Sequence, residues 1–209
     1  NHRYHTYDYF KVDPILGGNS ALIALIEALH KRGMKIILDG VFNHCGRGFW
    51  AFHHILENGM NSPYKDWFHI HKWPLKPYPI RGKNCGYSCW WNDPALPKFN
   101  HQHEPVKDYL LDVASYWVER GIDGWRLDVP DEVPSQFWRA FRTKLKAINP
   151  NIWIIGEIWG DAREWLKGDQ FDGVMNYRIG WGSLSWAACG KINRRYKNPA
   201  YPLSPINTK

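Results

Sequence analysis

Two short apolar segments each end in an acidic residue, and this pattern restricts the possible folds more than any other feature of the chain. Gly124-Trp-Arg126-Leu-Asp128 is one segment, and Ile152-Trp-Ile-Ile-Gly-Glu157 is the other. Because side chains alternate along a strand, Arg126 and Asp128 share one face of the predicted sheet. We therefore expect the guanidinium to hold the carboxylate of Asp128 ionised and in position.

Helical and extended patterns alternate along most of the chain. Apolar residues at helical spacing predict helices over 20–32, 104–120, 135–148 and, more briefly, 161–167. Apolar runs between breakers predict strands over 34–39, 122–128, 152–157 and 171–177. This alternation indicates an α/β fold with a parallel sheet, whose strands end at one common edge. Residues from 178 onward show no pattern that assigns an element.

One long segment, residues 45–100, interrupts this alternation. Asp128 and Glu157 lie 29 positions apart, the length of one strand–helix repeat, whereas Asp39 and Asp128 lie 89 apart. Loops of that length in compact domains are usually functional. We interpret 45–100 as a small inserted domain that follows a first unit over 1–44 and precedes a third over 101–209.

Polar residues at several strand ends are typical of the eight-stranded TIM (β/α)8 barrel. A doubly wound sheet is the alternative, but no Gly-x-Gly-x-x-Gly follows any predicted strand. Only four strands are visible, where a closed barrel has eight. The pattern therefore predicts part of a barrel.

Composition excludes some classes of function. The formal net charge is +7, yet the basic residues are scattered and no nucleic-acid-binding motif is present. No apolar run is long enough to span a membrane. The spacing of the four cysteines does not fit a zinc site, and unpaired thiols in a reducing, cytoplasmic compartment are favoured. Aromatic residues make up 16% of the chain, which fits a carbohydrate-binding or partner-binding surface. The histidines between 69 and 103 are interpreted as solvated, so no metal site is predicted.

Four motifs in order resemble the α-amylase family of glycoside hydrolases (family 13), and within it the neopullulanase, cyclomaltodextrinase and maltogenic amylase group. They are Asp39-Gly-Val-Phe-Asn43-His44, Leu96-Pro-Lys-Phe-Asn100, Gly124-Trp-Arg126-Leu-Asp128 and Gly156-Glu157-Ile-Trp159. The similarity runs from about residue 2 to 177. It implies that the chain holds about strands three to six of the barrel, with the inserted domain after the third strand.

The resemblance also implies a role for each matching residue in the chemistry. Asp128 is expected to be the catalytic nucleophile, Glu157 the general acid/base, and Arg126 the residue that orients Asp128. Retention of configuration requires the two carboxyl groups about 5–5.5 Å apart, with the nucleophile charged and the acid protonated. We expect Arg126 to lower the pKa of Asp128 and an apolar setting to raise that of Glu157.

Other matching residues are expected to bind substrate or support the site. The resemblance implies that His44 hydrogen-bonds sugar hydroxyls, that Tyr4 stacks beneath the same ring, and that Trp159 lines the positions beyond the cleaved bond. Asp39 and Asn43 are expected to tie the first strand's end to the inserted domain. No cofactor is required, and the resemblance leaves calcium open.

The implied activity is retaining hydrolysis of α-1,4 bonds in cyclodextrins, pullulan or starch. Val129-Pro-Asp-Glu132 differs from the Val-Ala-Asn-Glu usual in this group, which leaves α-1,6 bonds open as well. The alternatives are an ordinary α-amylase, an oligo-α-1,6-glucosidase or a non-catalytic relative. The sequence also leaves open whether the full-length enzyme forms a homodimer.

The family places a third carboxylate at the end of the seventh strand, and no matching His-Asp pair follows residue 177. We therefore expect the isolated 209-residue chain to have little hydrolytic activity. We also expect it to associate through an exposed sheet edge.

Overall fold

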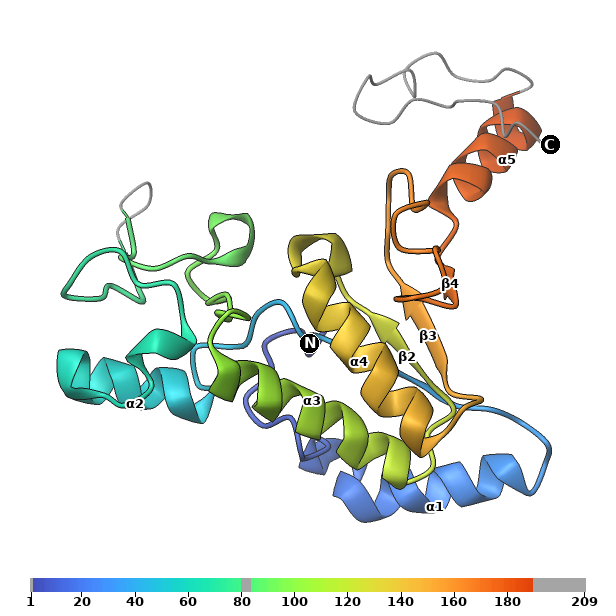
Figure 1. The fold of residues 1–209 in the computed structure, drawn as a ribbon, viewed down its shortest axis with the longest axis horizontal. Coiled ribbons are helices and arrows are strands. Elements are labelled where there is room, and N and C mark those ends of the chain that lie inside the picture. Colours follow the sequence, from blue (N-terminus) through green and yellow to red (C-terminus); the bar gives the residue numbers. More distant parts are fainter. Residues whose placement is uncertain (1, 80–83, 190–209) are drawn as a thin grey trace.

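The computed structural model describes residues 2–79 and 84–189, which form a parallel sheet with helices packed around it (Figure 1). The strands pair in the order in which they occur, all parallel. They are β1 (Ile37–Gly40), β2 (Gly124–Leu127), β3 (Trp153–Gly156) and β4 (Gly173–Val174). The predicted α/β class and parallel sheet are confirmed.

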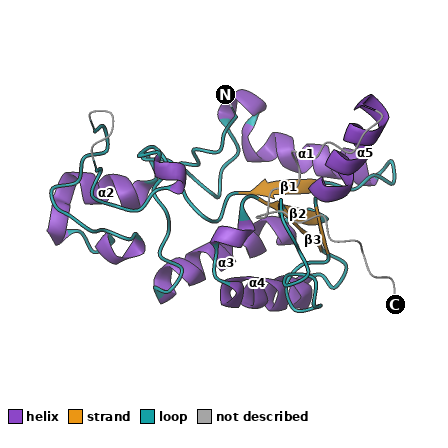
Figure 2. Ribbon diagram, turned by 90° about the horizontal axis from the view of Figure 1, so that it is seen from above, coloured by secondary structure: helices purple, strands orange, loops and turns teal. Residues whose placement is uncertain are grey.

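One helix precedes each of the first three strands, as the apolar spacing predicts. These helices are α1 (Gly18–His30), α3 (Glu104–Glu119) and α4 (Ser135–Ile148). Pro105 stands in the first turn of α3, where its missing N–H has no intrahelical partner to lose. Seen from above, the strands lie between α1 and the pair α3 and α4 (Figure 2). No helix in the described ranges is long and apolar enough to cross a membrane.

The strand register brings the strand ends to one edge of the sheet. Asp39 pairs with Arg126, which pairs in turn with Ile155. Gly156 ends β3 where the ring of Phe171 approaches closely, because a Cβ atom at this position would lie 2.6 Å from that ring. A larger residue there would displace the ring or the strand end. The residues that follow β1, β2 and β3 therefore lie side by side.

Alternation along β2 separates the core from the site. Trp125 and Leu127 are buried, and the ring of Trp125 lies 5.4 Å from that of Phe42 in an edge contact. The buried face of α4 packs into the same core through Phe137 and Phe141. Arg126 and Asp128 consequently lie on the opposite face, as predicted.

The segment between β1 and α3 extends to one side of the sheet (Figure 1). It contains α2 (Trp50–Asn58), short 3₁₀ turns and isolated antiparallel bridges, among them His44 with Lys98. The sequence analysis assigned no helix within 45–100 and so missed α2. This helix buries only Ala51, Phe52 and Ile55, which is too few positions to show a clear period.

Two further predictions at the C-terminal side are wrong. Residues 161–167 form successive turns instead of a helix, and the side chain of Asp161 accepts hydrogen bonds from Arg163 in place of a helical ladder. The strand predicted over 171–177 is reduced to the two residues of β4. A helix follows it, α5 (Tyr177–Cys189), where no element was predicted.

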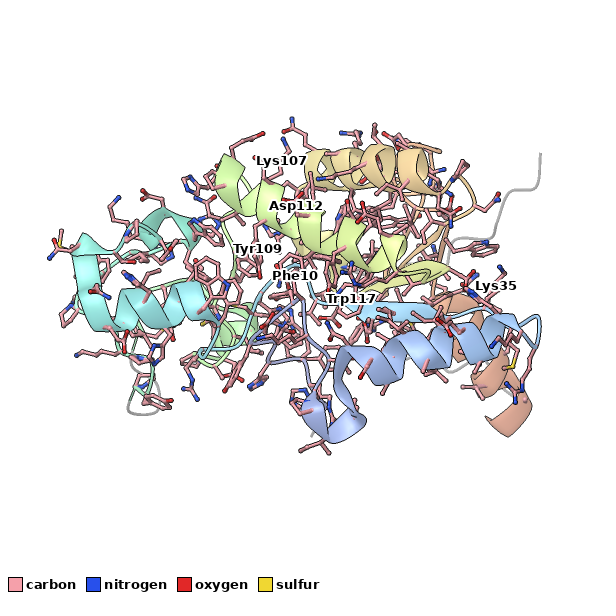
Figure 3. The ribbon with its side chains drawn as sticks, turned by 90° about the horizontal axis from the view of Figure 1, so that it is seen from below. Phe10, Lys35, Lys107, Tyr109, Asp112 and Trp117 are labelled. Carbon is pink, nitrogen blue, oxygen red and sulfur yellow. The ribbon has the colours of Figure 1, made fainter. Side chains whose placement is uncertain are left out.

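The N-terminal loop is held against α3. The indole N–H of Trp117 donates to the carbonyl of Tyr9 at 2.9 Å, and the rings of Phe10 and Tyr109 meet edge to face at 5.7 Å. Figure 3 shows Phe10, Tyr109 and Trp117 at this junction, with Lys35 at the far end of the molecule. The loop that carries Tyr4 is thereby anchored beside the sheet.

Candidate active site

One guanidinium lies at the centre of the candidate site. Nη1 of Arg126 lies 2.7 Å from Oδ1 of Asp39 and 3.1 Å from Oδ1 of Asp128, and Nη2 lies 2.8 Å from Oε2 of Glu157. Asp128 and Glu157 are each only 8% exposed. The two acids predicted from separate strand ends therefore face one shared cation at the carboxyl edge of the sheet.

Backbone hydrogen bonds fix the positions of Asp128 and Glu157. The amide of Asp128 donates to the carbonyl of Gly40 at 3.0 Å, and that of Glu157 donates to the carbonyl of Leu127 at 3.0 Å, which continues the ladder one residue beyond each strand. Val129 follows with a positive φ of 37°. A β-branched residue in that conformation is strained, and such strain is concentrated at functional sites.

Glu157 accepts hydrogen bonds from three further groups. The hydroxyl of Tyr177 donates to Oε1 at 2.9 Å, and the indole N–H of Trp159 donates to the same oxygen at 3.3 Å. The amide of Val129 approaches Oε2 at 3.4 Å. Glu157 is therefore surrounded by donors, in addition to Arg126.

These contacts shift the pKa values of Asp128 and Glu157 in directions opposite to those that the sequence analysis predicts. Burial raises the pKa of Asp128 to about 6, because the hydrogen bond and charge of Arg126 offset only part of the desolvation. Burial also acts to raise the pKa of Glu157, but hydrogen bonds from Trp159 and Tyr177, with the charge of Arg126, outweigh it and lower that pKa. The expectation of a depressed Asp128 and an elevated Glu157 is wrong because Arg126 is shared and Glu157 has the larger number of donors.

Asp39 belongs to this cluster and does not connect the strand to the following segment through its side chain. Its Oδ2 accepts a hydrogen bond from the hydroxyl of Tyr4 at 2.8 Å. Burial, followed by the hydrogen bond to Asp39, raises the pKa of Tyr4 to about 12. Tyr4 also lines a cavity of about 350 Å³ that reaches Asp39 and Trp125. Tyr4 and Asp39 thus extend the polar cluster toward the N-terminal loop.

His44 lies in the segment that follows β1. Its ring is buried and stacks on Trp90 at a centroid distance of 5.3 Å, and its Nδ1 accepts a hydrogen bond from the side-chain amide nitrogen of Asn43 at 3.1 Å. Burial lowers the pKa of His44 to about 4, so the ring is neutral. Its Nε2 has no hydrogen-bond partner among the described residues.

Backbone contacts connect the end of β1 to the segment behind it. Cys45 donates to the carbonyl of Pro97 at 3.1 Å, and Phe99 donates to the carbonyl of Asn43 at 3.1 Å. The Leu96–Asn100 motif is therefore paired directly with the stretch after β1. The connection predicted for Asn43 exists, but it runs through the backbone and not through the side chain.

Sequence reasoning missed Tyr177. It lies 20 positions after Glu157, at the start of α5, where the sequence predicts the end of a strand and no helix. The ring of Tyr177 lies 5.8 Å from that of Trp159, which is 39% exposed. The position of Tyr177 as the last residue of the strand predicted over 171–177 was the available signal.

Two of the histidines that the sequence analysis interprets as solvated have protein partners instead. Nε2 of His101 lies 2.9 Å from the carbonyl of Phe42, and Nε2 of His71 lies 2.7 Å from the hydroxyl of Ser88. Within residues 2–79 and 84–189, no group of three His, Cys, Asp or Glu side chains is placed to hold a metal ion.

The family model of the alpha-amylase catalytic domain matches residues 1–198. The chain is 49% identical over 189 residues to a cyclomaltodextrinase of Geobacillus thermopakistaniensis, which covers 90% of this chain and 32% of that protein. It is 46% identical over 194 residues to neopullulanase 2 of Thermoactinomyces vulgaris, with 92% and 32% covered. The chain belongs to the alpha-amylase catalytic-domain family, and it spans about a third of the length of these relatives.

Solved structures agree with this assignment. The native debranching enzyme of Nostoc punctiforme superposes with a TM-score of 0.89 at 49% identity, covering 98% of this chain and 42% of that one. The ligand-free cyclic α-maltosyl-(1→6)-maltose hydrolase of Arthrobacter globiformis gives a TM-score of 0.86 at 41% identity, with 90% and 42% covered. The parallel sheet therefore has the arrangement found in enzymes of this family.

Proposed function

We propose that this chain supplies the nucleophile and the general acid/base of a retaining glycosidase that hydrolyses α-glucosidic bonds. The observation that carries the proposal is the single guanidinium of Arg126 in contact with both Asp128 and Glu157. In this proposal β1–β4 are about strands three to six of a TIM barrel, and residues 45–100 form an inserted domain beside the cleft. The family to which the chain belongs supports this arrangement.

The chemistry proceeds in two displacements. A carboxylate oxygen of Asp128 attacks the anomeric carbon while Glu157 gives its proton to the leaving glycosidic oxygen, so that a covalent glycosyl ester forms and the C–O bond breaks. Glu157 then takes a proton from water, which attacks the same carbon and releases Asp128. With a pKa of about 6, Asp128 is largely ionised at neutral pH, as a nucleophile requires.

Glu157 must be protonated when the substrate binds, although its surroundings lower its pKa. A further carboxylate from the seventh strand, which the family resemblance implies, would add negative charge and raise that pKa. Substrate that displaces Tyr177 or Trp159 from Oε1 would act in the same direction. We therefore assign the acid role to Glu157 in the substrate-bound, complete barrel.

Substrate class follows from the relatives. Those named above are a cyclomaltodextrinase, a neopullulanase and enzymes named for debranching or for a cyclic α-1,6-linked maltose. We propose that the substrate is an α-glucan or a cyclodextrin and that the enzyme cleaves its α-1,4 bonds. Cleavage of α-1,6 bonds is the second candidate. A relative named intracellular maltogenic amylase, from Bacillus subtilis, supports a cytoplasmic location.

Substitution of the two acids tests the proposal in the complete enzyme. Asp128→Asn and Glu157→Gln should each lower kcat on cyclodextrin by roughly 10³-fold or more, because nucleophile and acid act as a unit. Asp161→Asn, which removes an exposed acid outside the cluster, is the matched control. Product analysis on pullulan separates the bond types. Wild-type turnover by Asp128→Asn would refute the assignment.

A further inference from the structure

Two cysteine thiols meet in the segment between β1 and α3. Sγ of Cys85 lies 3.9 Å from Sγ of Cys89, four positions further along the chain. Cys85 is only 5% exposed, whereas Cys89 is half-buried, so Cys89 is the more accessible of the two. Both are free thiols in this structure. The two sulfur atoms are therefore in contact without being bonded.

The turn between the two cysteines is held by the backbone beside it. Gly86 has a φ of 94°, and a side chain at this position would clash with the carbonyl oxygen of Lys72. The carbonyl of Gly86 accepts hydrogen bonds from the amides of His71 and Lys72 at 2.8 and 3.0 Å. The amide of Ser88 donates to the carbonyl of His69 at 2.9 Å. The fold itself therefore brings the two thiols together.

The chemistry of the pair favours slow exchange. A disulfide has a sulfur–sulfur distance of about 2.05 Å, and rotation of the side chains about χ1 supplies the remaining approach. Sγ of Cys85 lies 3.1 Å from the carbonyl oxygen of Tyr87, to which its S–H donates. Burial, followed by the neighbouring Cys85, raises the pKa of Cys89. The Cys89 thiol is therefore protonated at neutral pH and reacts slowly, and it would also be a poor leaving group when a disulfide is reduced.

We propose that Cys85 and Cys89 form a redox modification site, at which a small-molecule disulfide oxidises the two thiols to an intramolecular disulfide. The thiolate of Cys89 attacks one sulfur of the reagent, which releases one small thiol and leaves a mixed disulfide on Cys89. The thiolate of Cys85 then attacks the sulfur of Cys89 and releases the second small thiol. Two protein thiols are oxidised while one small disulfide is reduced to two thiols, and each leaving thiolate takes up a proton that a cysteine has given up.

The bond closes a ring over residues 85–89 and restrains the turn that follows it. The ring of Trp90 stacks on the buried ring of His44 at 5.3 Å, and the amide of Trp90 donates to the carbonyl of Leu96 at 3.0 Å. Trp91, next in this turn, is 71% exposed. Chymotrypsin should cleave after Trp91 several-fold more slowly in the oxidised enzyme than in the reduced enzyme, because cleavage requires the turn to open. Equal cleavage rates would overturn the restraint.

Peptide mass spectrometry of the intact enzyme tests the site. The enzyme is treated with oxidised glutathione at mildly alkaline pH, where the thiolate fraction is larger, and is digested with trypsin without reduction. The tryptic peptide 84–98 contains Cys85 and Cys89 and no other cysteine. This peptide should lose two hydrogens, and dithiothreitol should restore its mass. A peptide that stays reduced, or that carries a lasting glutathione adduct, would overturn the proposal.

Two variants separate the steps of the exchange. Cys85→Ser should stop at one glutathione adduct on Cys89, because the second thiol is missing, whereas Cys89→Ser should leave the buried Cys85 unmodified. Adducts in the reverse pattern would overturn the order of attack. Cys45 is fully buried and serves as the internal control, which should stay reduced throughout. Modification of Cys45 together with the pair would show that oxidation occurs only in unfolded protein, and would overturn the proposal.

Discussion

The acids at the two edges of the sheet have opposite environments. Asp123 precedes β2 at the amino edge and Asp172 precedes β4 at the same edge. Asp123 contacts His30, Lys35 and the amide of Ile36; Asp172 contacts Arg142, Lys146 and the amide of Ile154. In both, these donors outweigh the effect of burial and lower the pKa. Lys35 is seen at this end of the molecule in Figure 3.

At the carboxyl edge, three acids share one cation. Asp39, Asp128 and Glu157 all contact Arg126, and the pKa of Asp128 rises to about 6. Because Arg126 is shared, the burial of Asp128 is only partly offset, which costs stability, whereas a cluster of carboxylates stabilises a positively charged transition state. The balance of donors against burial therefore separates Asp128 from Asp123 and Asp172, while Glu157, which has donors of its own, keeps a lowered pKa at the same edge as Asp128.

Replacing the shared cation should have the largest effect. Arg126→Lys keeps one positive charge but cannot contact three carboxylates at once, because an ammonium lacks the planar fork. We expect kcat/KM to fall by roughly 10²-fold or more, with correct folding shown by circular dichroism. Arg139→Lys, at the exposed pair with Asp169, is the control and should retain full activity. Equal activity in the two variants would remove Arg126 from the centre of the site.

Replacing an acid at the amino edge, where hydrogen-bond donors outweigh the effect of burial, should affect stability instead of catalysis. Asp172→Ala leaves Arg142, Lys146 and the amide of Ile154 without their partner, and should lower the free energy of unfolding by about 1–3 kcal/mol. Asp128→Asn should cost less, because it relieves repulsion with Asp39 and Glu157. Urea unfolding of the intact enzyme measures both. A larger loss for Asp128→Asn would contradict the contrast.

The loss of unfolding free energy caused by Asp172→Ala should depend on pH in a defined direction. The pKa of Asp172 in the folded protein lies below its ordinary value of 3.8. Its contribution is therefore fully present above about pH 4–5 and is lost as pH falls through the folded-state pKa. The difference in stability between wild type and Asp172→Ala should shrink over that acidic range.

Removing the hydroxyl of Tyr177 should have the smallest effect. Tyr177→Phe deletes a donor to Glu157, which raises the pKa of that carboxyl, so the basic limb of the kcat profile, which reports the substrate-bound complete enzyme, should move to higher pH. The acidic limb, set by ionisation of Asp128 near pH 6, should stay in place. An acidic limb that moves while the basic limb does not would reverse the two assignments.

Much of the arrangement at the carboxyl edge of the sheet could be predicted from the sequence, because it depends on local patterns. The spacing of Arg126 and Asp128 in a strand fixes their shared face, and the repeat length fixes the position of Glu157 beside them. The helix predicted over 135–148 has the observed bounds of α4, because its apolar residues recur at helical spacing over four turns.

The electrostatics could not be predicted in the same way. The pKa directions depend on which oxygen meets which donor, and Tyr177 reaches Glu157 from an element that the sequence did not reveal. The turn that holds Trp91 at a positive φ likewise depends on hydrogen bonds specific to the fold, from Trp90 to the carbonyl of Leu96 and from Tyr87 to that of Pro94. Tertiary contacts of this kind leave no periodic signal.

Trapping of a covalent intermediate tests the central claim most directly. In a Glu157→Gln variant of the intact enzyme, a 5-fluoro-α-glucosyl fluoride should react without acid assistance, because fluoride leaves unaided, and the ester formed should persist. Peptide mass spectrometry should then find the added fluoroglucosyl mass on Asp128. The same mass on any other residue, or steady release of fluoride with no labelled peptide, would contradict the account.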